Sequence, residues 1–509
     1  MKYILAYDLG TGGTKACLYT QEGRLCASEF ASVKTYYPRE KFHEQRPEDW
    51  WHSVVRSVRQ LLQSSGVAPS DVAAIAGSGH SLGAVPLGED GRLLTEYCPI
   101  WSDSRAEAQA ARFFQSVSEG DWYLQTGCGF PAGLYTIFKI MWIQEHQPDV
   151  YRQAACFLGT KDYVNFRLTG VAATDHSYAS GSGVYLATAR RYEPRFLRAS
   201  GVDPAKLPRI LESSEVLGSL TEEASALLGL PRSVQVVAGG VDNACMATGA
   251  ACVSDGAAYT SLGTSAWIAV ASHQPIVSLD KRPYVFAHCV PGMFVSATSI
   301  FSAGNSLRWV KNTLCLDLLA QAEQSGKDVY DIITEIASHS PAGANKLLFN
   351  PSLAGGSCAE PSPDIRGALL GLTLGHTRSD VLRAVLEGIA MNLRLSMDIL
   401  SKMVPLAEEM LLVGGGGKSA VWRQIFADIY EKTILETNVG QDAGSLGAMA
   451  CAAVGLGFWP GYESVQGVHQ LRSRCTPARE TQSVYRALLP VFQQAASMQA
   501  ELGERLARL

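Results

Sequence analysis

One short pattern occurs twice in this chain, about half the chain apart. Residues 4–19 read ILAYDLGTGGTKACLY, and residues 257–270 read AAYTSLGTSAWIAV. Each copy has an apolar run, Leu-Gly-Thr, small residues and a second apolar run. Glycine permits a tight turn between two strands, and threonine offers a hydroxyl and a backbone N–H at its tip. Each copy therefore predicts a β-hairpin, and two such tips facing each other could hold a polyphosphate. A lone Leu-Gly-Thr would indicate only an ordinary hairpin, but its repetition argues against coincidence.

The length of 509 residues exceeds the roughly 250–300 residues that one hydrophobic core serves, so at least two domains are expected. Hydrophobic residues make up 47% of the chain, charged residues make up 18%, and the net charge is -5. These values are typical of a folded protein rather than a disordered or membrane-borne one. Nucleic-acid binding is not expected, because it needs a basic face and the sequence has no dense Lys/Arg run.

The 12 cysteines are scattered singly, without CxxC pairs or histidine-rich companions. This spacing suits neither a zinc site nor a secreted disulfide framework, and it indicates a reducing compartment. The first residues, MKYILAYD, run straight into a charged residue, so they form neither a signal-peptide core nor a span of about 20 apolar residues. We expect a cytoplasmic protein without a membrane partner.

Short apolar strands, such as residues 72–76 and 234–238, alternate with amphipathic stretches, such as residues 47–62 and 378–400. This alternation is typical of an α/β fold. The second hairpin sets a domain boundary near residues 246–256. The last segment, residues 480–509, predicts a terminal helix.

Two glycine-rich stretches resemble nucleotide-binding motifs but fail the tests for them. Residues 10–15, GTGGTK, lack the final glycine of a dinucleotide fingerprint and lie inside a hairpin. Residues 414–419, GGGGKS, end like a Walker A loop, but that motif needs glycine where Leu412 stands. What remains is a strand over 409–413, a glycine turn and a helix beginning at Ser419, which aims backbone N–H groups at an anion. Phosphate or nucleotide binding and simple close packing are both consistent with this turn.

Residues 79–83, GHSLG, match the nucleophile elbow of α/β-hydrolases. A serine hydrolase acting through Ser81 is therefore the alternative from another enzyme class. The elbow needs a helix after its serine. Residues 84–87 and 89–92 instead predict a second strand entering a hairpin turn, which disfavours the hydrolase.

Asp242 joins the strand from Val234 to a helix of small residues over 244–251. A carboxylate at such a strand end could accept a hydroxyl proton, orient a nucleophile or bind magnesium. The alternative is that Asp242 only caps the following helix.

Taken together, these features resemble the FGGY carbohydrate kinases along nearly the whole chain, and within that family they look most like xylulokinases. The ordered set of motifs is specific, whereas each motif alone is weak. The motifs are DLGT at 8–11, EQRPEDWW at 44–51, IWSD at 100–103, KDY at 161–163, GGVDN at 239–243, SLGTS at 261–265, RG at 366–367, GL at 371–372, EG at 387–388, and GGGGKS at 414–419 followed by Trp422, Gln424, Ala427 and Asp428.

The resemblance implies an α/β fold of two actin-like, ribonuclease-H-like ATPase domains with an interdomain cleft. Residues 1–250 would form the sugar-binding domain, and residues 251–509 the ATP-binding domain with a C-terminal helix from about 480. The implied reaction moves a phosphoryl group from ATP to a sugar hydroxyl, with Mg²⁺, and D-xylulose to D-xylulose 5-phosphate is the first choice. The expected partners are a small sugar and ATP, and a homodimer is the assembly considered.

The same resemblance assigns roles to individual residues. Asp242 would be the general base, and Asp8 would lie near the magnesium ion and hold it through water. The expected sugar-binding residues are His80, Trp101, Asp103, Asp242 and Asn243. The residues expected to bind ATP or its phosphates are Asp8, Thr11, Gly12, Lys15, Gly263, Thr264, Gly304, Gly415 and Ser419. Phosphoryl transfer needs mainly positioning and charge neutralisation, which such a set supplies.

Two departures from the family pattern bear on the substrate. Xylulokinases usually carry Gln-Met-His-Gly at the sugar-reading turn, where this chain has GSGHSLG at 77–83 with an extra residue. A Gly-Glu-Arg triplet that is common after the Phe-x-Pro segment is replaced here by GGS at 355–357. Ribulose, an L-ketose, gluconate and a polyol therefore stay open as substrates.

Overall fold

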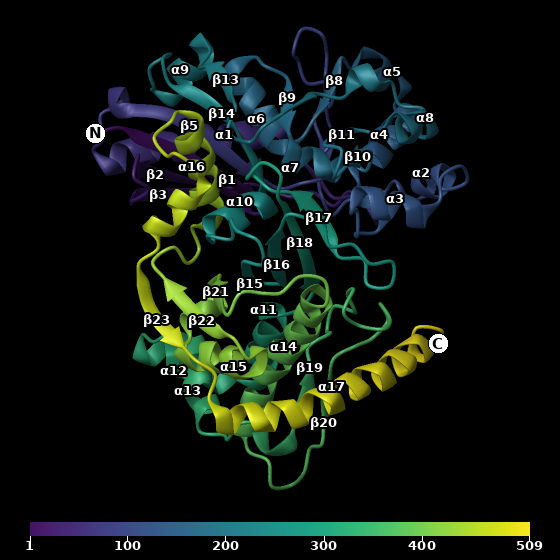
Figure 1. Ribbon diagram of the computed structural model, residues 1–509, viewed down its shortest axis with the longest axis vertical. Helices are drawn as coiled ribbons and strands as arrows, with labels where there is room; N and C mark the ends of the chain where they lie inside the picture. The colour runs from purple at the N-terminus through teal and green to yellow at the C-terminus, as the bar shows by residue number, and fades with distance from the viewer. The chain divides into compact units, whose positions relative to one another are not determined.

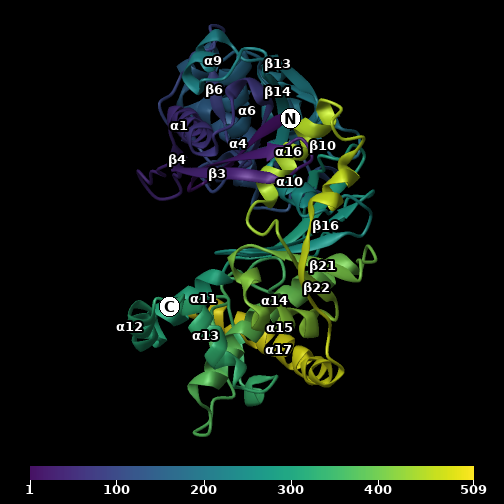
Figure 2. The same cartoon turned by 90° about the vertical axis from the view of Figure 1, so that its left-hand side faces the viewer.

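The computed structural model describes residues 1–509 and divides the chain into two units, each built from non-adjacent segments (Figures 1 and 2). Unit 1 contains residues 1–255, 271–296 and 442–468. Unit 2 contains residues 256–270, 297–441 and 469–509. Unit 2 first begins at residue 256, and two later segments, residues 271–296 and 442–468, return to unit 1.

Unit 1 is built on a six-stranded sheet with the strand order β13-β14-β5-β1-β2-β3. β1 is parallel to β5, and β5 is parallel to β14, whereas β2, β3 and β13 run antiparallel to their neighbours. The carboxyl ends of β1, β5 and β14 therefore meet at one edge of the sheet. The strands are β1 (Tyr3–Gly10), β2 (Gly13–Thr20), β3 (Leu25–Ser32), β5 (Val72–Gly79), β13 (Val216–Ser219) and β14 (Gln235–Val241).

The two faces of β1 are covered by different helices. Leu5, Tyr7 and Leu9 belong to a hydrophobic core that includes Trp50 of α1 (Pro47–Ser65). On the other face, α16 (Ala443–Gly455) packs on β1, β5 and β14. Because side chains alternate along a strand, Asp8 lies on the face that α16 covers.

Two helices of unit 1, α10 (Asp242–Gly249) and α16, touch backbone to backbone (Figure 1). A Cβ atom added at Gly447 would lie 1.8 Å from the carbonyl oxygen of Cys245, and one added at Gly249 would lie 1.8 Å from that of Ala443. Glycine at both contact points is what allows this approach. The contact holds α10, which begins with Asp242, close to the sheet.

In unit 2 the strands follow the order β18-β16-β15-β21-β22-β23. β15 is antiparallel to β16 and parallel to β21. The long helix α14 (Arg378–Ser401) packs against α13 (Val329–Ser338), α15 (Ala420–Tyr430) and α17 (Arg479–Leu506), the last drawn in yellow in Figure 1. The strands are β15 (Ala258–Leu262), β16 (Ala266–Ser272), β18 (Phe294–Ile300), β21 (Glu409–Val413), β22 (Thr433–Thr437) and β23 (Leu471–Cys475).

The elements predicted from the sequence are present. Both Leu-Gly-Thr copies form hairpins, β1–β2 and β15–β16. The amphipathic stretches form α1 and α14, and the terminal segment forms α17. The helix of small residues begins at Asp242 itself, two residues earlier than expected. None of the helices is both long enough and apolar enough to cross a membrane.

The contact between α10 and α16 predicts the effect of one added methyl group. Gly447→Ala should destabilise the protein by roughly 1–3 kcal/mol, the usual cost of overpacking, because the new Cβ would overlap the carbonyl oxygen of Cys245. Thermal or urea unfolding would measure this loss.

Gly120→Ala is the matched control. Gly120 lies inside α3 (Glu119–Thr126), where the nearest atom to an added Cβ is 3.5 Å away on the Leu279 side chain. Alanine there should be neutral or stabilising, because it favours the helix more than glycine does. Equal stability of the two variants would contradict a backbone contact at Gly447.

Candidate active site

The registers of the unit 1 sheet bring two aspartates to the same edge. Asp8 of β1 pairs with Ser78 of β5, and Ser78 pairs with Gly240 of β14, two residues before Asp242. The Ser78 hydroxyl donates a hydrogen bond to Asp8 Oδ1 at 2.8 Å. Because parallel strands end at the same edge of a sheet, Asp242 lies at the same edge as Asp8.

Asp242 is the first residue of α10, and Val241 occupies the capping position before it. Its Oδ1 accepts hydrogen bonds from the backbone N and the side-chain Nδ2 of Asn243, at 2.8 and 2.9 Å. The residue keeps partial solvent exposure, but its carboxyl group lies among protein atoms. This burial, together with the charge of Asp8, raises the pKa of Asp242 to about 7. A carboxylate with such a pKa suits proton transfer at neutral pH better than it suits helix capping.

A buried network of hydrogen bonds and an ion pair holds the backbone just before Asp242. The backbone N of Val241 donates to Ser177 Oγ at 2.9 Å, and that hydroxyl donates to Asp175 Oδ2. Asp175 Oδ1 in turn lies 2.9 Å from Lys161 Nζ, and both side chains are fully buried. Such a network is costly to rearrange, because breaking it would leave a buried charge unpaired. The network therefore restrains the start of α10.

Lys15 reaches the same edge through the first hairpin. It stands on β2 directly opposite Asp8, and its Nζ forms an ion pair with Asp442 at the capping position of α16. Gly444, in the first turn of α16, lies so close to Asp8 that a Cβ there would be 2.6 Å from Asp8 Oδ2. The amino end of α16 thus faces a carboxylate, which the helix dipole favours. Burial still raises the pKa of Asp8, against the opposing effects of Ser78 and Lys15.

The tip of the first hairpin is held by side chains and leaves one residue open. Gln45 Nε2 donates to the carbonyl oxygen of Thr11 at 2.7 Å, and Trp50 Nε1 donates to Gln45 Oε1 at 2.8 Å. Trp101 Nε1 donates to Thr11 Oγ1 at 2.9 Å. Gly12 is exposed, and an added Cβ would meet nothing within 4 Å. A fixed tip with an open glycine is suited to the approach of a phosphate group.

His80 lies buried just after β5, with 2% of its surface exposed. Neither of its ring nitrogens has a hydrogen-bond partner. The ring stands edge-on to Trp50, with centroids 5.6 Å apart. Burial and the nearby charge of Lys139 lower the pKa of His80 to about 3, so the imidazole is neutral. A neutral imidazole with both nitrogens unused can donate to one hydroxyl and accept from another.

The other predicted sugar-binding residues differ in how accessible they are. Trp101 is 40% exposed, whereas Asp103 is fully buried and accepts hydrogen bonds from Arg105 and from the backbone N of His43 at 2.8 Å. Lys139, on α4 (Thr136–His146), donates to the carbonyl oxygens of residues 82 and 100, at 2.9 and 2.6 Å. It thereby ties the loop after His80 to the loop before Trp101. Direct contact of Asp103 with a sugar stays a prediction.

Unit 2 contains a cavity of about 410 Å³ that collects all the residues predicted to bind ATP in that part of the chain. Gly263 and Thr264 come from the tip of the second hairpin, and Gly304 begins α11 (Gly304–Leu314). A Cβ at Gly304 would lie 2.4 Å from the carbonyl oxygen of Gly263, so only glycine fits there. The members of the predicted set that line the cavity are Gly263, Thr264, Gly304, Gly415 and Ser419.

The opposite wall of this cavity is the glycine turn after β21. Gly414 has φ 94°, in the region that favours glycine, and a 3₁₀ turn follows over Gly415–Lys418. Ser419 caps α15, accepting from the backbone N of Trp422 at 3.3 Å. Tyr330 and Trp422 add aromatic surface to the lining. Backbone N–H groups beside aromatic side chains suit a nucleotide, and the volume lies in the range of small-molecule sites.

Several residues that shape the site were not among the predicted ones: Gln45, Ser78, Lys139 and Asp442. Gln45 lies inside a motif that we recognised, and Ser78 follows from strand register once the strands are aligned. The Lys15–Asp442 pair spans 427 residues, so local sequence gives little sign of it. Ser81 is buried, and β6 (Val85–Leu87) follows it where the nucleophile elbow of a hydrolase needs a helix.

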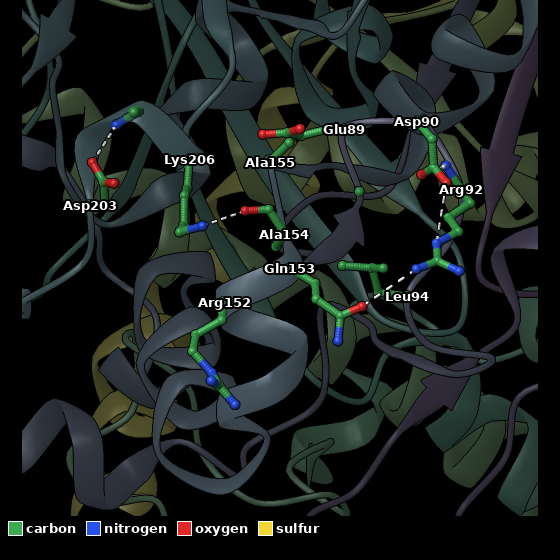
Figure 3. A pocket seen from close by; sticks show the side chains of 12 residues that line it. Glu89, Asp90, Arg92, Leu94, Arg152, Gln153, Ala154, Ala155, Asp203 and Lys206 are labelled. Carbon is green, nitrogen blue, oxygen red and sulfur yellow. Dashed lines mark hydrogen bonds and ion pairs between the residues drawn. The ribbon is translucent and has the colours of Figure 1, made fainter.

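A separate cavity of about 540 Å³ in unit 1 is lined by residues 88–94, 152–155 and 203–206, none of which belongs to the predicted site. Figure 3 shows interactions at Arg92, Lys206 and Asp203, but none for the side chains of Glu89 and Arg152. Arg92 contacts Asp90 and Gln153 at 3.3 and 3.5 Å, and Lys206 donates to the carbonyl oxygen of Ala154. We assign no function to this cavity.

Comparison with known proteins shows which family the chain belongs to. The N-terminal domain model of the FGGY family of carbohydrate kinases matches residues 3–249, and the C-terminal domain model matches residues 258–456. A xylulose kinase of Bacillus subtilis (strain 168) is 30% identical over 463 residues, which is 91% of this chain and 90% of that protein. A gluconokinase of Bacillus licheniformis is 26% identical over 96% of this chain and 94% of its own. The crystal structure of a xylulose kinase from Lactobacillus acidophilus has a TM-score of 0.90 at 25% identity, covering 99% of this chain and 100% of that one.

These matches define a carbohydrate kinase, a phosphotransferase with an alcohol group as acceptor. The chain belongs to the FGGY family of carbohydrate kinases. The resemblance and the two-domain fold predicted from the sequence are confirmed. Kinases of this family use ATP, generally with a divalent metal ion. The roles of individual residues stay predictions.

The raised pKa of Asp242 predicts a pH-dependent change in stability. Its pKa is about 7 in the folded state, against an ordinary value of 3.8 for aspartate, so ionising it costs stability increasingly as the pH rises between these values. Asp242→Asn removes that cost. We therefore expect the melting temperature of Asp242→Asn to rise relative to the parent between about pH 4 and about pH 8. A difference in melting temperature that stays constant over this range would contradict the raised pKa.

Proposed function

We propose that this kinase transfers the terminal phosphoryl group of ATP to a hydroxyl of D-xylulose, giving D-xylulose 5-phosphate. The observation that carries the reaction type is Asp242, a carboxylate with a pKa near 7 at the sheet edge shared with Asp8. The choice of sugar rests on the similar proteins named xylulose kinase and on the chemistry of the sugar loops.

In this proposal the sugar hydroxyl loses its proton to Asp242 as it attacks the terminal phosphate. The neutral ring of His80 and the exposed indole of Trp101 bind the sugar, and Asn243 keeps the Asp242 carboxylate oriented. Residues 1–250 serve as the sugar-binding domain, and residues 251–509 serve as the ATP-binding domain. The nucleotide lies in the 410 Å³ cavity, with the glycine turn and Ser419 against it.

Mg²⁺ is the divalent ion that we propose. The donor set fits it, because Asp8 offers a hard carboxylate oxygen and magnesium is usually held by one or two carboxylates plus water. Asp8 would hold the ion through water, and the bound ion would neutralise charge on the phosphates. The ion pair of Lys15 with Asp442 keeps the lysine beside Asp8, where it favours negative charge on the incoming phosphate.

The charges near the sugar loops favour an uncharged sugar over gluconate. Gluconate carries a carboxylate, which would need a cation that is not already paired. Arg105 is paired with Glu44 and Asp103, and Lys161 is paired with Asp162 and Asp175. Burial lowers the pKa of Lys139 to about 7, and its Nζ is already used by two carbonyl groups. An uncharged ketose needs no unpaired cation.

The decisive variant for this function is Asp242→Asn. Asparagine keeps the size and most hydrogen bonds of aspartate but cannot accept the proton, so turnover should fall by roughly 10²- to 10⁴-fold. Sugar-dependent ADP release would measure the loss, using a panel of D-xylulose, ribulose, an L-ketose, gluconate and a polyol. D-xylulose should give the highest kcat/KM of the panel.

Ser81→Ala is the control for the hydrolase alternative, and it should keep the kinase rate near that of the parent. Covalent labelling of Ser81 by a fluorophosphonate, or esterase activity that Ser81→Ala abolishes, would favour the hydrolase. Turnover of Asp242→Asn within about threefold of the parent would contradict the general-base role. A higher kcat/KM for gluconate would overturn the choice of sugar but not the reaction type.

A further inference from the structure

Three buried cysteines meet beneath the start of α10. They are Cys245 on α10, Cys289 just after β17 (Tyr284–Ala287) and Cys451 on α16. Their sulfur atoms all lie within 4.8 Å of one another, and those of Cys245 and Cys289 are 4.0 Å apart. At most 1% of the surface of each residue is exposed. The cysteines are far apart in the sequence, so their spacing gave no sign of this cluster.

The sulfur positions are close to those that a single metal ion would require. A metal–thiolate bond of about 2.3 Å places sulfurs about 4.0 Å apart around a trigonal ion and about 3.8 Å apart around a tetrahedral one. The sulfur atoms of Cys245 and Cys289 are 4.0 Å apart, and no two of the three sulfur atoms are more than 4.8 Å apart. Three thiolates could therefore close on one ion through small side-chain adjustments.

The surroundings of the cluster suit a negatively charged thiolate group. Tyr462 is buried next to Cys451, where its hydroxyl can donate to the sulfur. Cys245 stands in the first turn of α10, where the helix dipole favours an anion. Three thiolates and one divalent cation together carry one negative charge. The Tyr462 hydroxyl and the amino end of α10 both lie beside that charge.

The cluster also touches the backbone that carries Asp242. Cys245 lies one helical turn after Asp242 on α10. A Cβ added at Gly240 would lie 2.9 Å from Cys289 Sγ and 3.0 Å from Cys245 Sγ, so the end of β14 rests on both sulfurs. Movement of these sulfurs toward an ion would change their contact with the turn from Gly240 to Asp242.

We propose that Cys245, Cys289 and Cys451 form a binding site for a thiophilic divalent cation of the zinc group. Occupation of the site displaces the start of α10 and slows phosphoryl transfer. This second part rests on the proposed role of Asp242, whereas the binding site does not.

Cadmium is the probe, because cadmium thiolates have a charge-transfer absorption in the near ultraviolet. The metal-free full-length protein, kept reduced with a phosphine, is titrated with Cd²⁺. We expect the absorption to saturate at one ion per chain and the melting temperature to rise, because the ion binds only the folded cluster. Cys245→Ala and Cys451→Ser should each lose most of the absorption while keeping the circular dichroism of the parent.

Cys252→Ser is the matched control. Cys252 is also buried, lies just after α10 and donates to the carbonyl oxygen of Ala250, outside the cluster. It should bind one Cd²⁺ as the parent does. The site is refuted if both cluster variants bind Cd²⁺ as the parent does. It is also refuted if the reduced parent gives no thiolate absorption, or if the cluster forms a Cys245–Cys289 disulfide that persists under the phosphine.

Activity tests the second part separately. After removal of free Cd²⁺, the parent with one bound ion should turn over at least fivefold more slowly with Mg²⁺ and ATP, and a chelator should restore the rate. The Cys252→Ser control should behave in the same way. Unchanged turnover with the ion bound would refute the coupling to α10 and leave the site intact. Asp242→Asn should still bind Cd²⁺, so failure of the proposed function would not be mistaken for failure of the site.

Discussion

The site of unit 1 depends on the parallel pairing of β1, β5 and β14. Parallel strands point their carboxyl ends the same way, and their registers put Asp8, Ser78 and Gly240 in one row. Two residues beyond that row the chain turns into α10, and the turn carries Asp242. A slip of one residue in either pairing would carry Asp8 to the opposite face or shift Asp242 along the edge. The position of Asp242, the proposed base, is therefore a property of the sheet rather than of a loop.

That arrangement sets the electrostatics of the edge. Two carboxylates so close together cannot both ionise easily, and burial adds to the cost. The protein relieves the cost at Asp8, with the Ser78 hydroxyl, the nearby Lys15 and the amino end of α16, more than at Asp242, which is left with Asn243. Unequal surroundings separate the roles of two similar groups: one is suited to hold a metal ion and the other to accept a proton.

Much of the fold and of the candidate site could be predicted from the sequence, because the informative features are local. Three features can each be recognised within about a dozen residues: the Leu-Gly-Thr hairpins, the strand and glycine turn before Ser419, and the Asp242 turn. The residues that were missed act over long separations. Asp442 meets Lys15, and Cys451 meets Cys245, only because α16 returns to unit 1 late in the chain. A single boundary placed at residue 250 gives no sign that α16 returns to unit 1. That return depends on close packing between glycines of α10 and α16.

The central claim is that a single carboxylate with a pKa near 7 accepts the proton of the sugar. With Mg²⁺ and ATP saturating, the pH dependence of kcat/KM for the sugar reports the ionisation of groups that catalysis requires in the enzyme–nucleotide complex. It should be measured from about pH 5.5 to about pH 9 with saturating Mg²⁺ and ATP and limiting D-xylulose. If Asp242 is the base, kcat/KM should fall tenfold per pH unit below about 7 and be level above it. A profile that stays level down to about pH 5.5 would contradict it.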